Sequence, residues 1–182
     1  MSGVFILLLC YLFWDKMIEK ILLLVLLTFV PTLESRWSIP IGIFSGEIKT
    51  SFFTFQGLAM DPLQVFIIVV IANIILGPIA FFLADKIVNV FTKIKIIDRL
   101  YQWWLSKVMK KKSLVDKYGV LAIIFFVGLP LPGSGSWGGA FSAKFLNVPF
   151  KTYLIGNTIG VIIAATIVLA ISLGAFGFLG LV

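Results

Sequence analysis

The chain has 182 residues, of which 60% are hydrophobic and only 13% are charged, with a formal net charge of +7 and a mean hydropathy of +1.13. Soluble domains carry about 25% charged residues, so this composition excludes a soluble domain. It predicts a single integral membrane domain. The lack of histidine and the single cysteine, Cys10, exclude histidine-based catalysis, histidine metal ligands and an internal disulfide. We therefore expect no enzyme activity, no metal and no cofactor.

Residues 1–20 are predicted to form a short N-terminal helix. The apolar run "VFILLLCYLF" is followed by the charged stretch "DKMIEK". No basic residue precedes the run and no small-residue cleavage site follows it, so we expect it to be retained rather than removed as a signal peptide. As a helix the apolar part is only about 17 Å long, which leaves two alternatives, a short membrane span or a helix at the membrane surface.

The apolar segment 21–33 is too short to cross a bilayer, because it gives only about 20 Å of helix before Glu34. The stretch "ESRWSIP" then places an acid, an arginine and Pro40 where lipid is expected, and the apolar "SIPIGIFSG" follows. We interpret residues 21–46 as a re-entrant hairpin, whose irregular backbone needs cover from protein or a water-filled cavity. The alternative is one kinked spanning helix with an ion pair inside it.

Glu34 and Arg36 are the candidate functional pair of this hairpin. Two residues apart on a helix, they would point about 200° away from each other, so we expect a turn or separate partners. An ionised side chain at the bilayer centre costs about 2.5–3.5 kcal/mol, so neither is expected to face lipid unpaired. We predict that Arg36 binds an anionic headgroup, with Glu34 as its partner or as a protonatable counter-charge. The alternative is a structural salt bridge at the hairpin tip.

Residues 62–84 are long enough to form a transmembrane helix, and they carry Asn73. An unpaired amide is costly in lipid, so Asn73 is predicted to line a cavity or to bond another helix. The following segment, 86–117, is rich in lysine, which alternates with apolar residues that include Trp103 and Trp104. We predict a cytoplasmic amphipathic helix on anionic headgroups of the inner leaflet, rather than a nucleic-acid site.

A second short apolar segment, 118–129, ends in "PLPGSGSWGG". Prolines remove backbone donors and glycines permit conformations that other residues avoid, so this stretch predicts a second hairpin break. The breaking residues are Pro130, Pro132, Gly133 and Gly135. With Ser134 and Ser136, the amides after the break are predicted to form a helix N-terminus that binds an anion at the midplane. Tight helix packing is the alternative.

Residues 152–176 form the second predicted transmembrane helix and carry Asn157. The order of hairpin, linker and long helix thus occurs twice. If 86–117 is cytoplasmic, the first hairpin opens to the outside and the second to the inside, as in transporters built from inverted repeats.

Small residues recur at four-residue spacing in the return arm of each hairpin. They are Ser38, Gly42 and Gly46 in the first arm, and Gly135, Gly139 and Ala143 in the second. In lipid such stripes let backbones approach closely. We predict that the arms pack against each other or against a long helix, and a homodimer is a candidate assembly.

Three stretches carry a resemblance to a known family. "ESRWSIPIG" resembles the Glu-x-Arg-x-x-Ile-Pro-hydrophobic-Gly motif of the putative small multidrug export protein family, although Trp37 and Ser38 stand where Gly-Ala is usual. "LPLPGSGSWGG" resembles its Pro-Leu-Pro-Gly-Thr-Gly-Ala-Trp-Thr-Gly segment, and "ANIILGPIAFF" resembles its Asn-x-x-x-x-Pro helix. The resemblance covers residues 21–171.

That family is considered a relative of the DedA superfamily, whose members have two opposed re-entrant hairpins and include proteins associated with moving anionic lipid carriers or scrambling phospholipids. The resemblance implies transport. The functional positions that it implies are Glu34, Arg36, Pro40, Pro130, Pro132 and Gly133, with Trp137 beside them.

The sequence therefore predicts an all-α protein of the cell membrane, an inverted repeat of hairpin plus transmembrane helix, divided into 1–20, 21–85, 86–117 and 118–182. We expect it to move an anionic lipid or lipid phosphate, passively or coupled to H+ or Na+. The alternatives are an exporter of drugs or cations and a non-transporting scaffold. The candidate substrate-binding or ion-binding residues are Glu34, Arg36, Asn73, Ser134, Trp137 and Asn157.

Overall fold

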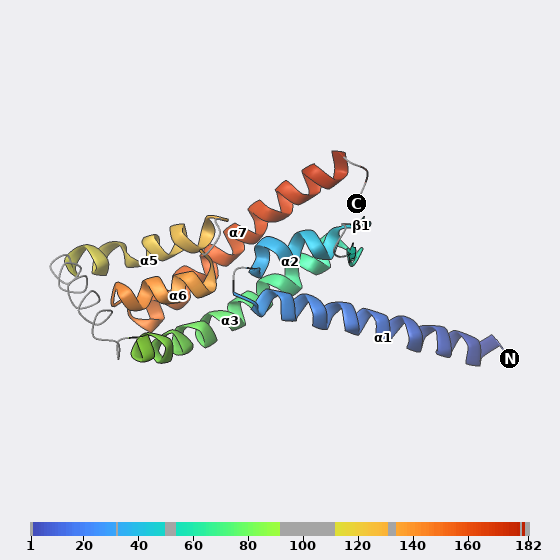
Figure 1. Cartoon of the computed structure of the whole chain (residues 1–182), viewed down its shortest axis with the longest axis horizontal. Coiled ribbons are helices and arrows are strands. Elements are labelled where there is room, and N and C mark those ends of the chain that lie inside the picture. The colour runs from blue at the N-terminus through green and yellow to red at the C-terminus, as the bar shows by residue number, and fades with distance from the viewer. Residues whose placement is uncertain are drawn as a thin grey trace.

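The computed structural model describes residues 2–31, 33–49, 54–91, 112–130, 134–178 and 180. The helices in these ranges are α1 (Ser2–Phe29), α2 (Glu34–Ile43), α3 (Pro62–Phe91), α5 (Lys112–Gly128), α6 (Ser136–Phe145) and α7 (Phe150–Phe178) (Figure 1). Two three-residue strands, β1 (Glu47–Lys49) and β2 (Thr54–Gln56), pair antiparallel. The predicted all-helical fold is confirmed, and this short hairpin, which is too short to give a period-two pattern, is the β structure that the described residues contain.

Helix α1 is continuous, so the predicted boundary after Lys20 is wrong. The stretch "DKMIEK" contains no glycine or proline, and its charges therefore do not end the helix. The end of α1 at Phe29 is explained by Pro31, because a proline disfavours helical backbone at the residue before it. Lys20 Nζ donates a 2.6 Å hydrogen bond to Leu58 O, which fixes α1 to the loop before α3. The N-terminal half of α1 extends beyond the other helices (Figure 1).

Two helical stretches among the described residues are long and apolar enough to cross a membrane, Pro62–Ala84 in α3 and Phe150–Ala175 in α7. They coincide with the segments predicted at 62–84 and 152–176. Helices α2 and α6 have 10 residues each, about 15 Å, and are too short to cross. The chain thus runs twice through a helix, a break, a ten-residue helix and a long helix, while the orientation of the two halves in a membrane stays a prediction.

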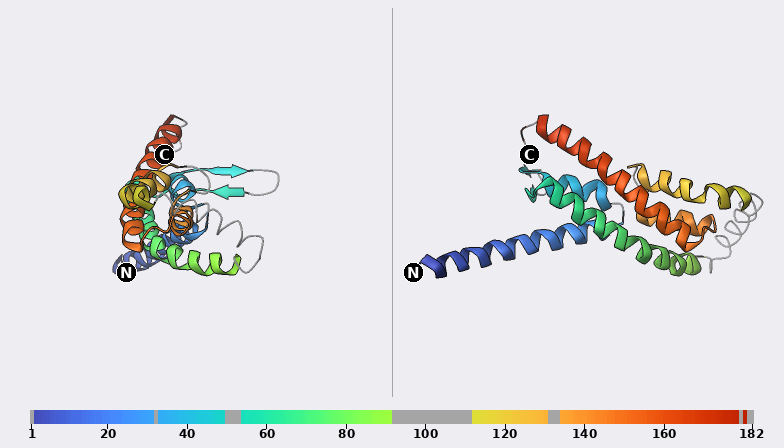
Figure 2. Two further views of the ribbon diagram at one scale, coloured as in Figure 1. Left: turned by 90° about the vertical axis from the view of Figure 1, so that its left-hand side faces the viewer. Right: turned by 180° about the vertical axis from the view of Figure 1, so that it is seen from behind.

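The two ten-residue helices start near the middle of the molecule and run toward opposite ends of its long axis (Figures 1 and 2). Each packs against both α3 and α7, while α1 packs on α3 and α5 packs on α7. Two buried apolar clusters fill the bundle, one that includes Leu24, Ile39 and Val65 and one that includes Ile123, Ala140 and Tyr153. On α3, Asn73 follows Val65 and Val69, which are buried in the first cluster, and precedes Ala80, which is buried in the second. A polar residue therefore lies between the two sets of buried positions.

The small-residue stripes make close helix contacts in their central part only. An added Cβ at Gly42 would lie 2.7 Å from Val65 Cγ1 on α3, and one at Gly139 would lie 2.6 Å from Val127 Cγ2 on α5. Gly42 thus lies close to the long helix α3, while Gly139 lies close to α5, the shorter helix that precedes it in the chain. Gly46 lies beyond the end of α2, so the first stripe is shorter than predicted.

The predicted amphipathic helix with Trp103 and Trp104 falls largely on residues 92–111, which lie outside the described residues. On either side, α3 continues to Phe91 and α5 begins at Lys112. The predicted borders of this segment, at residues 86 and 117, are therefore wrong. Lysine is a good helix former and can extend its ammonium group to the headgroups, so the basic residues at these borders do not end the helices.

Candidate functional site

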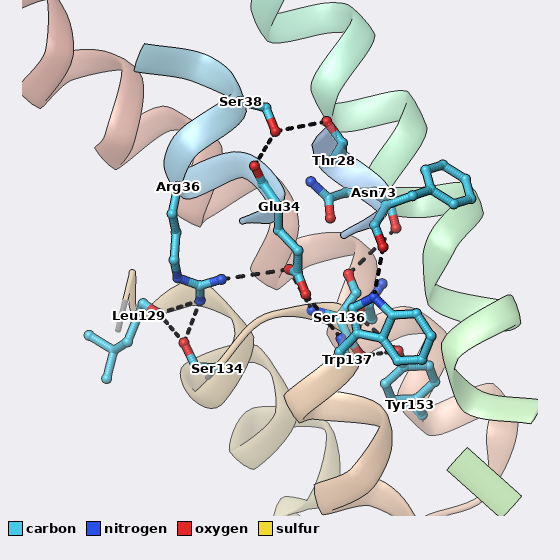
Figure 3. Close-up of polar contacts among 12 residues, drawn as sticks. Thr28, Glu34, Arg36, Ser38, Asn73, Leu129, Ser134, Ser136, Trp137 and Tyr153 are labelled. Carbon is cyan, nitrogen blue, oxygen red and sulfur yellow. Dashed lines mark hydrogen bonds and ion pairs between the residues drawn. The ribbon is translucent and has the colours of Figure 1, made fainter. Parts of the chain in front are cut away.

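Four helix ends meet in the middle of the molecule, and polar side chains bridge them (Figure 3). They are the C-terminal ends of α1 and α5 and the N-terminal ends of α2 and α6. Helix N-termini leave unpaired N–H groups and a partial positive charge, and C-termini leave unpaired C=O groups and a partial negative charge. An apolar bundle therefore needs acceptors beside the first kind of end and donors beside the second.

Glu34 supplies the acceptors for α6. Its side chain is only 2% exposed, Oε2 accepts a 3.0 Å hydrogen bond from Ser136 N, and Oε1 accepts a 3.2 Å bond from Trp137 N. No side chain of the α6 cap residue itself fills this role, because that residue is Gly135. The predicted anion-binding N-terminus therefore exists, and the anion that occupies it is the carboxylate of this chain.

Arg36 supplies the donors for α5. Its side chain is 8% exposed, and Nη2 donates a 3.1 Å hydrogen bond to Leu129 O, just beyond the end of α5, and another to the Ser134 hydroxyl. Nη1 lies 3.6 Å from Glu34 Oε2, an ion pair longer than a hydrogen bond. Arg36 Nε and Nη1 have no hydrogen-bond partner among the described residues. With respect to the described residues, this buried guanidinium therefore has spare donor capacity.

We expected Glu34 and Arg36 to meet through a turn or to have separate partners. They form an ion pair, and each of them also has other partners. Both lie in the first turn of α2, and Glu34 has a φ of 37°, a backbone region that non-glycine residues rarely adopt. Such a conformation costs on the order of 1–3 kcal/mol and persists where the surroundings enforce it. It occurs at the residue whose carboxylate joins the two halves of the chain.

Trp137 closes the end of α1 in the same way that Arg36 closes the end of α5. The Trp137 indole Nε1 donates a 3.2 Å hydrogen bond to Phe29 O, the carbonyl of the last residue of α1. Each hairpin therefore sends a side chain from its short helix to the broken end of the first helix in the other hairpin. The two halves are joined by an exchange of such contacts (Figure 3).

Gly135 lies so close to the ion pair that a side chain at this position would overlap it. Its φ is 99°, a region that favours glycine, and an added Cβ would overlap Glu34 Oε2 and lie 2.6 Å from Arg36 Nη1. The sequence suggested that Gly135 belongs to a helix-packing stripe, but in the structure it belongs to the charged centre. The Ser134 hydroxyl beside it donates a 2.6 Å hydrogen bond to Leu129 O.

The predicted hairpin breaks are only partly where we placed them. Pro40 lies inside α2, so its assignment as a break is wrong. It removes the N–H that would have bonded the Arg36 carbonyl, but the helix continues because packing on α3 and α7 holds it. Pro130 follows α5 as expected, while Pro132 and Gly133 lie outside the described residues.

Hydroxyl groups extend the polar region toward α1. Thr28 Oγ1 lies 3.0 Å from Ser38 Oγ and 2.8 Å from Leu24 O, and the Ser38 hydroxyl donates to the Glu34 carbonyl. Ser38 is therefore a polar contact as well as a small packing residue. Thr28 was not among the predicted site residues, although it is the only polar residue in "ILLLVLLTFV".

Asn73 and Asn157 extend the polar region toward α3 and α7. The Tyr153 hydroxyl lies 2.9 Å from Ser136 O, 3.2 Å from Gly77 O and 3.4 Å from Asn157 Oδ1. Neither side-chain atom of Asn73, nor Nδ2 of Asn157, has a hydrogen-bond partner among the described residues. A buried unpaired amide group costs about 1–3 kcal/mol. Tyr153, one helical turn before Asn157, was not among the predicted site residues.

The six candidate site residues thus gather in one polar region. Glu34, Arg36, Ser134 and Trp137 form its charged centre through direct contacts. Asn73 is reached through the Ser136 hydroxyl, 3.5 Å from the Asn73 carbonyl, and Asn157 is reached through Tyr153. Chemically, the region offers an internal carboxylate on helix amides and an arginine with unused donors, both shielded from solvent.

Comparison with known proteins gives one family. A sequence model described as "Putative small multi-drug export protein" matches residues 34–167, a range that begins at Glu34 and contains α2, α3, α5 and α6 with most of α7. No curated protein matches, and no solved structure matches. The predicted relation to the DedA superfamily stays a prediction.

Proposed function

Because the chain belongs to the family described as putative small multi-drug export proteins, we propose that it is a membrane exporter whose solute meets the protein at the charged centre of Glu34 and Arg36. A family of exporters is not a class of enzymes, and the two long apolar helices agree with a place in the membrane. We further propose that the solute carries an anionic group.

The observation that carries this proposal is the buried guanidinium of Arg36. Two of its three nitrogens, Nε and Nη1, make no hydrogen bond to the described residues, although the side chain is only 8% exposed. Buried donors are normally satisfied, and a planar guanidinium suits phosphate or carboxylate oxygens. An anionic group on the solute would use these donors.

Glu34 gives the proposal a mechanism. Its carboxylate occupies the α6 amides and lies 3.6 Å from Arg36, so it holds the position that a solute anion would take. A solute that replaces Glu34 there would separate α2 from α6. The inverted arrangement of the two halves, supported by the opposite directions of α2 and α6, would then let the centre open to one side at a time.

The solute that we favour is a phosphate-bearing lipid. The resemblance of the sequence motifs to a superfamily associated with anionic lipids supports this choice, as does the position of the centre between apolar clusters. A drug-like cation is the second candidate, which the description of the family favours. It would need Glu34 to leave the α6 amides and face the solute.

The test uses the full-length protein reconstituted in liposomes. Movement of a fluorescent anionic phospholipid between leaflets is compared for the wild type, Arg36→Ala and Arg36→Lys, with folding checked by size-exclusion chromatography. Arg36→Lys keeps the charge but loses the planar fork, so we expect at least about tenfold slower movement, equivalent to about 1.4 kcal/mol. Lys151→Ala, an exposed lysine outside the centre, is the control and should match the wild type.

The two candidate solutes separate in the same liposomes. Loss of lipid movement in both Arg36 variants supports the anionic lipid. Efflux of ethidium that depends on Glu34 but not on Arg36, without lipid movement, would favour the cation exporter. Full lipid movement in folded Arg36→Ala would contradict the role of Arg36.

A further inference from the structure

Two buried amides beside the charged centre keep polar atoms that bond none of the described residues. Asn73 on α3 is 1% exposed and Asn157 on α7 is 0% exposed. Both side-chain atoms of Asn73 and Nδ2 of Asn157 lack a hydrogen-bond partner among the described residues. Each unpaired group in a native protein calls for an explanation, and a ligand that binds there is one.

These amides adjoin the charged centre through a single residue. Ser136 donates its backbone N–H to Glu34, and its hydroxyl lies 3.5 Å from the main-chain carbonyl oxygen of Asn73, on the helix that carries this amide. Its own carbonyl accepts the Tyr153 hydroxyl, which also lies 3.4 Å from Asn157 Oδ1. Ser136 thus joins the residues that carry both amides to the helix end that holds Glu34, next to Arg36.

The chemistry of this second region is neutral. An amide offers two donors and an acceptor, which matches a hydroxyl group that both donates and accepts. The ionised side chains that the structure places at this end of α6 are Glu34, which is engaged with the α6 amides, and its ion-pair partner Arg36. The unpaired groups therefore suit an uncharged hydroxyl rather than a second charge.

We infer that Asn73 and Asn157 form a subsite for hydroxyl groups of the solute, next to the charged centre that takes its anion. The inference rests on the proposed function and deepens it, because it names the solute class as a phosphate ester with a hydroxylated headgroup. A site built to hydrogen-bond a hydroxyl discriminates against the analogue that lacks it. Asn73 and Asn157 are thus specificity-determining residues.

The test compares two short-chain lipids on the purified full-length protein, dihexanoyl phosphatidylglycerol and dihexanoyl phosphatidic acid. Both carry a phosphate, but only the first has glycerol hydroxyls. We expect the wild type to bind phosphatidylglycerol at least tenfold more tightly by calorimetry. Asn73→Leu and Asn157→Leu should lower that affinity to the level of phosphatidic acid and leave phosphatidic acid binding unchanged.

A second measurement is the unfolding temperature without ligand. If the amides await a ligand, leucine removes unpaired buried groups, and the unfolding temperature should stay the same or rise. A fall would mean that structural water or internal bonds satisfy the amides, and would overturn the inference. Thr158→Val is the control, because its hydroxyl bonds Leu154 O of its own helix, and it should keep the wild-type preference.

The remaining outcomes separate the subsite from the proposed function. If the Asn variants lose the preference while Arg36→Lys binds both lipids like the wild type, the subsite stands and the role of Arg36 fails. If the Asn variants keep the preference while Arg36→Lys binds both lipids weakly, the anion site stands and the subsite is overturned. A wild type that binds neither lipid overturns the subsite as stated.

Discussion

Glu34 explains why a chain so rich in apolar residues places charges between two apolar segments. Its carboxylate accepts two amide hydrogen bonds at the start of α6, and Arg36 next to it binds the carbonyl that follows α5. Both charges therefore complete helix ends, which in water would be satisfied by solvent. The ion pair between them, at 3.6 Å, is the weaker part of the arrangement.

Gly135 is the residue whose substitution the charged centre should tolerate least. In Gly135→Ala the added methyl group would strain a backbone at φ 99° and overlap the Glu34 carboxylate. We expect the free energy of unfolding to fall by more than about 1 kcal/mol, measured by thermal unfolding in detergent. Gly174→Ala is the matched control on α7, where an added Cβ meets no atom within 4 Å, and it should be neutral or stabilising. Equal losses in both variants would contradict this account.

The hydrogen bond between Trp137 and the end of α1 can be tested in a similar way. Trp137→Phe keeps the aromatic packing but removes the N–H that bonds the Phe29 carbonyl, which leaves that carbonyl unpaired at a cost of about 1–3 kcal/mol. The last turn of α1 should then open more often. Hydrogen exchange of a peptide covering residues 24–31 should accelerate at least about fivefold.

Trp37→Phe gives the control for this measurement. Trp37 lies on α2, is 58% exposed and makes no contact of this kind, so its substitution should leave exchange in residues 24–31 unchanged. Unchanged exchange in Trp137→Phe as well would show that the indole does not hold the end of α1.

The helices differ in how well they could be predicted from the sequence. The segments 62–84 and 152–176 were predictable because each is a mainly apolar run of membrane length without a charged residue. The continuity of α1 was not, because "DKMIEK" was interpreted as a boundary although charges do not break helices. Pro40 was predicted as a break because proline usually is one, but the chain breaks earlier, before Glu34.

The contacts of the site were less predictable than its residues. Glu34 and Arg36 were recognisable as charges in an apolar run. The partners of Glu34 were not, since they are backbone amides 102 and 103 residues away, and no local pattern encodes them. Tyr153 was missed for the same reason, because its hydroxyl acts on residues of α3 and α6.

The molecule as a whole allows a test of orientation. If the halves are inverted, the ends of α2 and α6 face opposite sides of the membrane. In a Cys10→Ser background, Ser45→Cys, after α2, should react with an impermeant thiol reagent from outside, and Lys151→Cys, after α6, only from the cytoplasm. Both positions are exposed. Labelling of both cysteines from one side would contradict the inverted arrangement.

The exchange of contacts between the halves has a consequence for how the protein is made. The N-terminal half leaves the ribosome first, and its Glu34 and Arg36 then lack Ser136, Trp137 and Leu129. Each unpaired charge costs about 2.5–3.5 kcal/mol at the bilayer centre, so the first hairpin should not settle there alone. We therefore expect the first half to settle in the membrane only after about a hundred further residues have been synthesised.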